Sequence, residues 1–235
     1  METYPAPALV TWGIASLALL VGAAALGLAS RALGTGRVWL FGLGWVGLIA
    51  AVSGSGLLAN FDARPPPLAL FMVALVSLSF WVGLSRHTAA VAARTPLAVL
   101  VGLQAFRLPL ELVMHEAASS GVMPRELSFS GYNFDILTGA FALILAPLIA
   151  LGKAPRWAVV AWNTLGFVCL FAILVIAILT APFILALGPQ SANRWVAYVP
   201  FVYLPAVMVL VAVAGHCHVA RWLRQNPGPL TPPRT

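Results

Sequence analysis

Seven long apolar runs, almost free of charged residues, follow one another along the chain and constrain its fold more than any other feature. A helix that crosses the hydrocarbon core of a bilayer needs about 20 mostly apolar residues. We therefore predict an all-α, polytopic membrane helix bundle that forms one domain over residues 1–225. The seven predicted membrane-spanning helices cover residues 8–30, 38–59, 68–84, 96–118, 135–152, 156–183 and 196–222.

The amino-acid composition argues against a soluble globular protein. Only 8% of the residues are charged and 61% are hydrophobic, whereas about a quarter of the residues of a soluble domain are charged. The formal net charge of +7 does not indicate nucleic-acid binding, because the basic residues lie between the apolar runs and form no patch. Residues 226–235 are rich in proline and are predicted to form a disordered cytoplasmic tail.

The distribution of basic residues predicts how the bundle is oriented in the membrane. Nine of the thirteen Lys and Arg residues fall on one side, namely Arg31, Arg37, Arg86, Arg94, Lys153, Arg156, Arg221, Arg224 and Arg234. The connections on the other side contain only Arg64, Arg125 and Arg194, and Arg107 lies inside the fourth predicted helix. Because Lys and Arg accumulate in cytoplasmic loops, we predict an external N-terminus and a cytoplasmic C-terminus.

Four polar residues lie on one face of the fourth predicted helix. Gln104, Arg107, Glu111 and His115 share a narrow sector at 100° per residue, and the last three are successive i, i+4 neighbours. An ionised side chain at the centre of a bilayer costs roughly 2.5–3.5 kcal/mol, so the stripe is expected to face the bundle interior or a wet cavity. Pro109 lies among these residues and is expected to kink the helix.

The stripe has two interpretations that the sequence does not separate. In the first, Arg107 and Glu111 neutralise each other and tie the fourth helix to its neighbours. In the second, the ionisable side chains form a pathway or a binding site. Arg107 would then bind an anionic group or pair with Glu111, and Glu111 or His115 would carry protons.

A polar segment over residues 124–139 follows the stripe and has two interpretations as well. Asn133 or Asp135 could cap the fifth helix, and Asp135 also suits the dipole at a helix N-terminus. Alternatively, Tyr132, Asn133 and Asp135 fold back over the stripe and close an outward-facing polar pocket. Two hydroxyl groups from the seventh helix could join that pocket, those of Tyr198 and Tyr203.

These motifs carry a resemblance to known sequences. The pattern FR-x3-E-x3-H at residues 106–115, then G-x-x-P at 121–124 and SFSGYNFDILTG at 128–139, resembles a family of uncharacterised bacterial multi-pass integral membrane proteins. Further similar segments are FD at 61–62, WN-x-L-G at 162–166 and YVPFVYLP at 198–205. The resemblance implies a multi-pass protein of the bacterial inner membrane. It supports the polar site but implies no reaction.

Common cofactors of membrane proteins find little support in the sequence. Retinal needs a lysine within a span, but Lys153 is the only lysine and lies in a predicted loop. Bis-histidine haem needs two histidines at matching depth, and His115 is predicted at a different depth from His216 and His218. The cofactor, if there is one, stays unknown.

Three further groups of side chains are of types that can bind metals or form disulfides. Glu111, His115 and Asp135 form a weak candidate metal set, an E-x3-H helix face plus one carboxylate. His216 and His218 point about 200° apart on a helix and are predicted to be solvated at the membrane interface. Cys169 and Cys217 are predicted to be buried free thiols.

Three functions are compatible with these observations. The first is a small-solute or proton-coupled transporter-like protein with an outward-facing pocket formed by Arg107, Glu111, His115, Asn133 and Asp135. The second is an accessory or structural subunit of a membrane complex, in which the charges connect helices. The third is a membrane-embedded, metal-assisted hydrolase. The expected surroundings are a lipid bilayer, with a second copy of the chain or another membrane protein as candidate partners and no nucleic acid.

Overall fold

The computed structural model describes residues 4–230, and the regular elements among those residues are all helices. The α-helices are α1 (Ala8–Leu33), α2 (Arg37–Gly54), α3 (Pro67–Leu84), α4 (Ala89–Arg94), α5 (Leu97–Leu103), α6 (Arg107–Ser119), α7 (Asp135–Ala150), α8 (Arg156–Leu179) and α9 (Leu210–Gln225). A 3₁₀ turn at Gln104–Phe106 joins α5 to α6, and a π-helix at Leu204–Val209 leads into α9.

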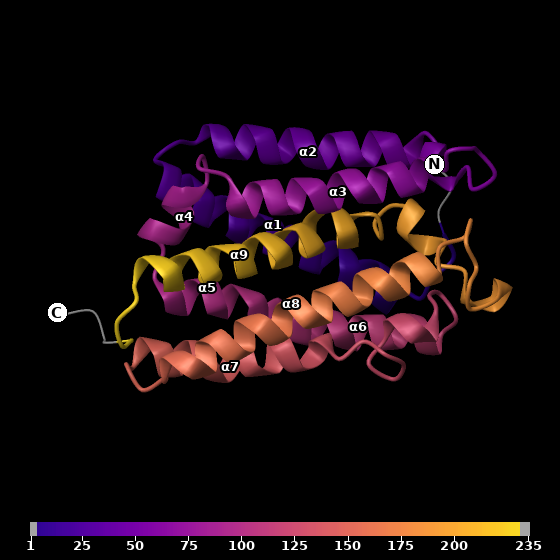
Figure 1. The fold of residues 1–235 in the computed structure, drawn as a ribbon. Helices are drawn as coiled ribbons and strands as arrows, with labels where there is room; N and C mark the ends of the chain where they lie inside the picture. Colours follow the sequence, from indigo (N-terminus) through magenta and orange to yellow (C-terminus); the bar gives the residue numbers. More distant parts are fainter. Residues whose placement is uncertain (1–3, 231–235) are drawn as a thin grey trace.

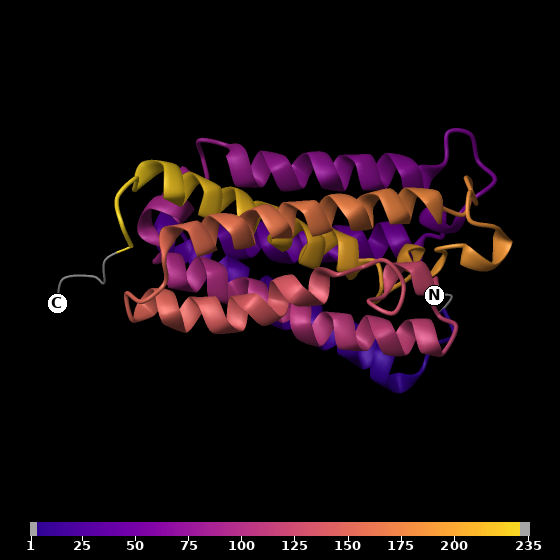
Figure 2. The same cartoon turned by 60° about the horizontal axis from the view of Figure 1, so that its bottom comes forward.

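The helices run side by side in an elongated bundle and alternate in direction (Figure 1). The start of α1, the α6–α7 connection and the α8–α9 connection lie at one end, which we call the N-terminal end (Figures 1 and 2). The α1–α2 and α7–α8 connections, the short helix α4 and the end of α9 lie at the opposite, C-terminal end. This arrangement is typical of a multi-pass membrane bundle.

Six helical segments of the described chain are long and apolar enough to cross a membrane. They are α1, α2, α3, the joined α5–α6 segment Leu97–Ser119, α8, and the joined π-helix and α9 over Leu204–Gln225. The fifth predicted helix, 135–152, corresponds to α7, which is apolar but has only 16 residues. The all-helical, multi-pass class predicted from the sequence is therefore confirmed by six helices that are long and apolar enough to cross a membrane.

Several helix ends differ from the sequence-based boundaries. Helix α2 ends at Gly54 and α8 at Leu179, several residues before the ends predicted at 59 and 183. The last helix begins at Leu204 where residue 196 was expected, because residues 195–203 form a short 3₁₀ helix and turns. The sequence-based prediction therefore overestimated the length of three helices.

Proline residues determine where many of the helices begin. Helices α1, α5 and α8 each start directly after a proline, and α3 has Pro67 as its first residue. A proline disfavours helical geometry in the residue before it and lacks the N–H that a helix start would leave unpaired. Helix α1 ends at Gly34, whose φ of 67° is the left-handed conformation that stops a helix.

Pro109 interrupts the long α5–α6 segment, as the sequence predicted. It is the third residue of α6 and has no N–H to donate to the carbonyl of Ala105, four residues earlier. The backbone at Gln104–Phe106 accordingly changes from an α-helical to a 3₁₀ turn. This irregular turn lies one residue before Arg107, the centre of the polar site described below.

Helix α7 starts deep inside the bundle, beside the middle of the α5–α6 segment. It is about 24 Å long at 1.5 Å per residue, shorter than the roughly 30 Å hydrocarbon core. The connection over residues 120–134 descends from the N-terminal end and buries Ser128 and Asn133 before α7 begins. Irregular backbone at such depth is tolerated when protein surrounds it.

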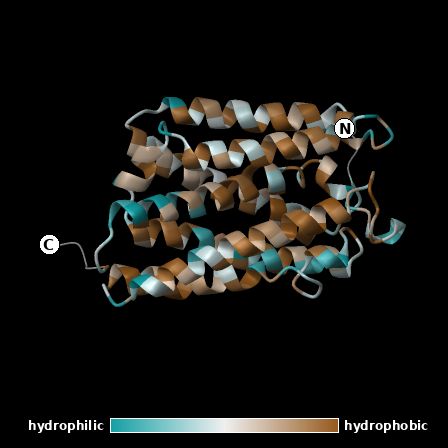
Figure 3. Cartoon of the chain, viewed as in Figure 1, coloured by the Kyte–Doolittle hydropathy of each residue, from teal (hydrophilic) through white to brown (hydrophobic). Residues whose placement is uncertain are grey.

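The outer surface of the bundle is apolar, as expected of a protein surrounded by lipid. Trp12, Leu40, Phe41 and Phe171 are 72%, 72%, 79% and 68% exposed, and hydrophobic residues cover most of the helices (Figure 3). Exposed apolar surface on this scale would aggregate in water. Helix α9 is central, because ten of its residues are buried, whereas only Ile49 and Ser53 are buried in α2.

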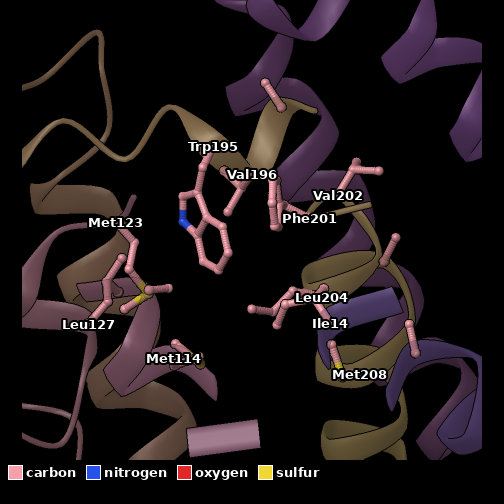
Figure 4. Packing of buried hydrophobic residues seen from close by; sticks show 14 of the residues in the cluster. Ile14, Met114, Met123, Leu127, Trp195, Val196, Phe201, Val202, Leu204 and Met208 are labelled. Carbon is pink, nitrogen blue, oxygen red and sulfur yellow. The ribbon is translucent and has the colours of Figure 1, made fainter. Parts of the chain in front are cut away.

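The two largest apolar clusters of the interior lie toward opposite ends, and a smaller third cluster joins α8 to α9. The cluster at the N-terminal end includes Met114, Met123, Trp195 and Phe201, which pack from different parts of the chain (Figure 4). Trp195 is only 1% exposed and belongs to this core. The second cluster joins α5, α7, α8 and the end of α9. Polar side chains are buried between the two clusters.

Candidate functional site

Arg107 is the centre of a buried polar network. It is the first residue of α6 and is only 1% exposed. Its Nε donates to Oδ2 of Asp135, the first residue of α7, at 2.6 Å. This contact is the one salt bridge among residues 4–230. The positive end of the α7 dipole and the guanidinium both favour a charged Asp135 carboxylate.

The sequence suggested Glu111 as the partner of Arg107, and the structure instead pairs Arg107 with Asp135. A helical side chain points back toward the N-terminus of its own helix. The guanidinium of Arg107 therefore extends away from Glu111, which lies one turn further toward the C-terminus of α6. The start of α7 supplies a carboxylate on the side to which the guanidinium extends.

His216 of α9 is the second partner of Arg107. Nη1 of Arg107 lies 2.8 Å from Nε2 of His216, and Nδ1 of His216 lies 2.9 Å from Oδ1 of Asn163 on α8. A guanidinium can only donate, so Nε2 accepts and the ring hydrogen is on Nδ1, which donates to Asn163. The hydrogen bonds thus require a neutral His216. The prediction that His216 is solvated at the interface is wrong, because its exposure is 0%.

Glu111 joins the same network through Asn133. Nδ2 of Asn133 donates to Oε1 of Glu111 at 2.7 Å, and Oδ1 of Asn133 accepts from the backbone N–H of Asp135 at 3.1 Å. A continuous chain of hydrogen bonds results, and we call it the buried network: Asn163, His216, Arg107, Asp135, Asn133 and Glu111. It connects α8, α9, α6, α7 and the α6–α7 connection.

Several polar atoms in and beside the buried network have no hydrogen-bond partner among the described residues. They are Arg107 Nη2, Glu111 Oε2, Asp135 Oδ1, Thr138 Oγ1 and both amide atoms of Gln104. Buried polar groups normally find a protein or water partner, and leaving one unpaired costs about 1–3 kcal/mol. The concentration of such atoms around one arginine distinguishes this region from an ordinary structural ion pair.

Three glycines allow the helices to approach the buried network closely. A Cβ atom at Gly166 of α8 would overlap the imidazole ring of His216, and one at Gly215 of α9 would overlap the amide of Gln104. A Cβ atom at Gly139 of α7 would overlap the backbone at Arg107 and Leu108. Small residues thus let polar side chains and backbones meet across the helix interfaces.

Most of the residues that the sequence predicted for the polar pocket lie together in the structure, but some of them lie apart from the buried network. Gln104, Arg107, Glu111, Asn133 and Asp135 are buried in one region. His115 is separate: its Nδ1 lies 3.3 Å from Ser128 Oγ, and its ring stacks on Phe129 at 4.5 Å between centroids. The expected pocket that includes His115 is therefore not formed as one group.

The tyrosines do not cover the stripe in the predicted way. Tyr132 is 65% exposed, Tyr203 donates its hydroxyl to the carbonyl of Val46 at 3.2 Å, and Tyr198 packs on Tyr4 with ring centroids 5.3 Å apart. Because these side chains point elsewhere, the buried network is covered by helices and by the 120–134 connection.

The candidate metal ligands each have a separate partner. Glu111 accepts from Asn133, Asp135 is paired with Arg107, and His115 contacts Ser128. Within residues 4–230 no group of three or more His, Cys, Asp or Glu side chains is arranged to hold a metal ion. Cys169 and Cys217 are buried free thiols, as predicted, and His218 is buried with an unpartnered Nδ1, contrary to its predicted solvation.

The sequence-based prediction did not include Asn163 and Thr138 in this region. It considered His216 but placed this residue at the membrane interface. A signal was present, because Asn163 and His216 are polar residues within apolar runs, and such residues usually face a bundle interior. Their mutual contact could not be foreseen without the rotation and depth of α8 and α9.

Comparisons with known proteins do not extend this description. The chain matches no protein-family model, no curated protein and no solved structure. The geometry of the buried network is therefore the basis for assigning its role.

Proposed function

We propose that this chain is a proton-coupled transport protein for a small solute, in which Glu111 binds and releases the proton. It would lie in the bacterial inner membrane with its N-terminus outside and its C-terminus in the cytoplasm, crossing the membrane seven times with α7 as a short seventh span. The observation that carries the proposal is the environment of the Glu111 carboxyl group.

Glu111 is a buried carboxyl group for which the described chain provides no ion-pair partner. It is 1% exposed, accepts one hydrogen bond from the neutral amide of Asn133, and has an unpartnered Oε2. Arg107 directs its Nε to Asp135 and its Nη1 to a neutral His216. An uncompensated buried charge costs several kcal/mol, so Glu111 is expected to hold a proton at rest.

The two carboxyl groups have different environments, which suits them to different roles. Asp135 has an arginine and a helix N-terminus beside it and is expected to stay ionised. Glu111 has neither, and it is connected to Asp135 through Asn133. A proton on Glu111 would change the charge of the whole network by one unit. Such intramembrane carboxyl groups are typical of proton relays in transporters.

Infrared difference spectroscopy of the purified protein in lipid nanodiscs would test the state of Glu111. We expect a carbonyl stretch of a protonated carboxylic acid at neutral pH, absent from Glu111→Gln. Glu116→Gln, on the same helix, is the matched control and should retain the band. A wild-type spectrum without this band, or a band unchanged in Glu111→Gln, would contradict the proposal.

Transport itself would be tested in proteoliposomes. Under an imposed proton gradient, uptake of labelled small carboxylates, phosphates, amines and sugars would be recorded together with the internal pH. We expect at least one solute to show gradient-dependent uptake with proton movement that Glu111→Gln abolishes and Glu116→Gln keeps. Absence of such coupled uptake for every solute class, together with no infrared band, would favour a structural role for the network.

The second candidate function is an accessory subunit of a membrane complex. The observation that favours it is that Arg107 connects α6 to both α7 and α9, as expected of charges that hold helices together. This alternative predicts that another membrane protein co-purifies in fixed stoichiometry after gentle extraction. Native mass spectrometry would detect that partner. Under this alternative, the partner should stay bound in Glu111→Gln.

A further inference from the structure

A second polar feature lies at the N-terminal end of the bundle, apart from the buried network. It is a cleft of about 500 Å³ lined by residues 118 and 121–125, by residues of the α8–α9 connection, and by Tyr4. Ligand sites for small molecules typically have volumes of about 300–1,000 Å³. None of the residues that line the cleft is acidic, and two of them, Arg125 and Arg194, are arginines.

The two arginines approach the cleft from different segments of the chain. Arg125 belongs to the α6–α7 connection and Arg194 to the α8–α9 connection. The guanidinium of Arg194 lies 5.8 Å from the centre of the Phe61 ring, a cation–π distance that restrains it. The carboxyl group nearest in sequence, that of Glu126, accepts a hydrogen bond from Ser191 at 2.7 Å and does not line the cleft.

The other polar groups at the cleft can also donate hydrogen bonds. Burial raises the pKa of the Tyr4 hydroxyl, and the nearby Arg194 lowers that pKa by a smaller amount, so the hydroxyl stays protonated. The amide of Gln190 lines the same cleft. These groups, with the two guanidinium groups, give the cleft donors on more than one side.

An unpartnered N–H group belongs to Trp195, the residue that follows the cleft residue Arg194. Trp195 directly follows Arg194, is 1% exposed, and its Nε1 has no hydrogen-bond partner among the described residues. Figure 4 shows the indole nitrogen turned toward Met123, which lines the cleft. An indole N–H is a donor only, so an acceptor is the group that would satisfy it.

We infer that this cleft is a binding site for a small anion that carries carboxylate or phosphate groups. Arg125 and Arg194 would bind the anionic oxygens, because guanidinium groups form strong, charge-assisted hydrogen bonds with both kinds of anion. Trp195 does not line the cleft, so its N–H would gain an acceptor only if the anion reached past Met123. The anion is either a free solute or the phosphate of a lipid headgroup, since both present the same oxygen atoms.

This inference deepens the proposed function by naming the chemical class of the transported solute, and in that respect it rests on that function. Met123 lines the cleft and also belongs to the apolar cluster at the N-terminal end. The same cluster contains Met114 of α6. A solute bound in the cleft would therefore lie on the side of this cluster that faces the N-terminal end. Anion binding and the protonation of Glu111 have separate readouts, so either can fail without the other.

The test is calorimetric titration of the full chain, in nanodiscs of uncharged lipid, with succinate and with inorganic phosphate. We expect saturable binding of at least one probe that weakens at high ionic strength. The Arg125→Gln/Arg194→Gln double variant should bind at least roughly tenfold more weakly, as expected when charge-assisted hydrogen bonds are lost. Arg64→Gln removes another exposed arginine and is the matched control, which should bind as the wild type does.

Two further measurements complete the test. Trp195→Phe keeps the ring but removes the N–H, and we expect it to weaken probe binding several-fold while the infrared band of Glu111 is unchanged. Native mass spectrometry from nanodiscs with anionic lipid separates the two sources of anion. A phospholipid adduct lost in the double variant, without binding of the soluble probes, would assign the site to headgroup phosphate. Equal binding of every probe by wild type and double variant, or no binding of any, would overturn the inference.

Discussion

Arg107 shows how a single buried residue organises its surroundings. Its guanidinium contacts a charged partner, Asp135, and a neutral one, His216, and so connects residues that are 28 and 109 positions away in the sequence. Both contacts form together only when α6, α7 and α9 adopt one relative position. A residue of this kind selects one arrangement of helices among several that apolar packing alone would allow.

Removing one member of the Arg107–Asp135 pair should destabilise the protein strongly. In Asp135→Asn the guanidinium stays buried without its counter-charge, and we expect the free energy of unfolding to fall by roughly 3–5 kcal/mol. Unfolding in mixed micelles of mild and denaturing detergent would measure the change. Asp62→Asn, at an exposed carboxylate, is the control and should change the stability by less than about 0.5 kcal/mol.

The double variant Arg107→Met/Asp135→Leu distinguishes a charge effect from a packing effect. Because both charges are removed together, we expect it to recover a large part of the stability that Asp135→Asn loses. If the double variant is no more stable than Asp135→Asn, the shape of the side chains would matter more than their charge.

At the residue level, the sequence correctly predicted which face of the α5–α6 segment is buried. It did not predict which side chains that face contacts. Gln104, Arg107 and Glu111 were placed on one inward face by helical periodicity, and all three are buried. Asp135 was considered as a cap or a pocket member, but its pairing with Arg107 depends on the depth at which α7 begins. His216 was placed in solvent, because periodicity within one helix does not reveal which neighbour that helix meets.

At the scale of the helices, α7 departs most from the regular pattern. Its 16 residues begin at Asp135, so its N-terminal dipole is directed at the buried network and not at a membrane surface. Discontinuous helices that end near the centre of a bundle often form ligand sites in transporters. The start of α7 inside the bundle could not be predicted from the sequence, because the apolar run that contains α7 has nearly the length of a complete span.

Glycine contacts at the helix interfaces make a prediction about α8. In Gly166→Ala the new methyl group would overlap the His216 ring, which two hydrogen bonds hold in place. We expect the free energy of unfolding to fall by about 1–3 kcal/mol. Gly44→Ala in α2, where a Cβ atom would meet nothing within 4 Å, is the matched control and should be neutral or slightly stabilising.

The whole molecule is an apolar bundle with polar groups at its two ends and one buried polar layer between its apolar clusters. The number and order of the long helices followed from the apolar runs alone, since hydropathy and length determine which segments can cross a bilayer. Which helices pack against the central helix α9 could not be deduced in this way, because every helix in lipid presents a similar apolar surface.

Topology provides a prediction at this scale. The proposed seven passes would put the two termini on opposite sides of the membrane, and the distribution of Lys and Arg predicts a cytoplasmic C-terminus. A reporter that is active only in the cytoplasm, fused after residue 235, should be active, whereas one that requires export should be inactive. The reverse pattern would show that the orientation is wrong.

The long sequence separation between Arg107 and His216 has a consequence for biosynthesis. Arg107 enters the membrane when α6 is synthesised, and its carboxylate partner follows soon afterwards with α7, but the histidine is 109 residues away. The nascent chain must therefore hold Nη1 of Arg107 without its histidine partner until the last helix is inserted. Completion of α9 would then act as the locking step of assembly, and chains truncated before His216 should be preferred substrates for membrane quality-control proteases.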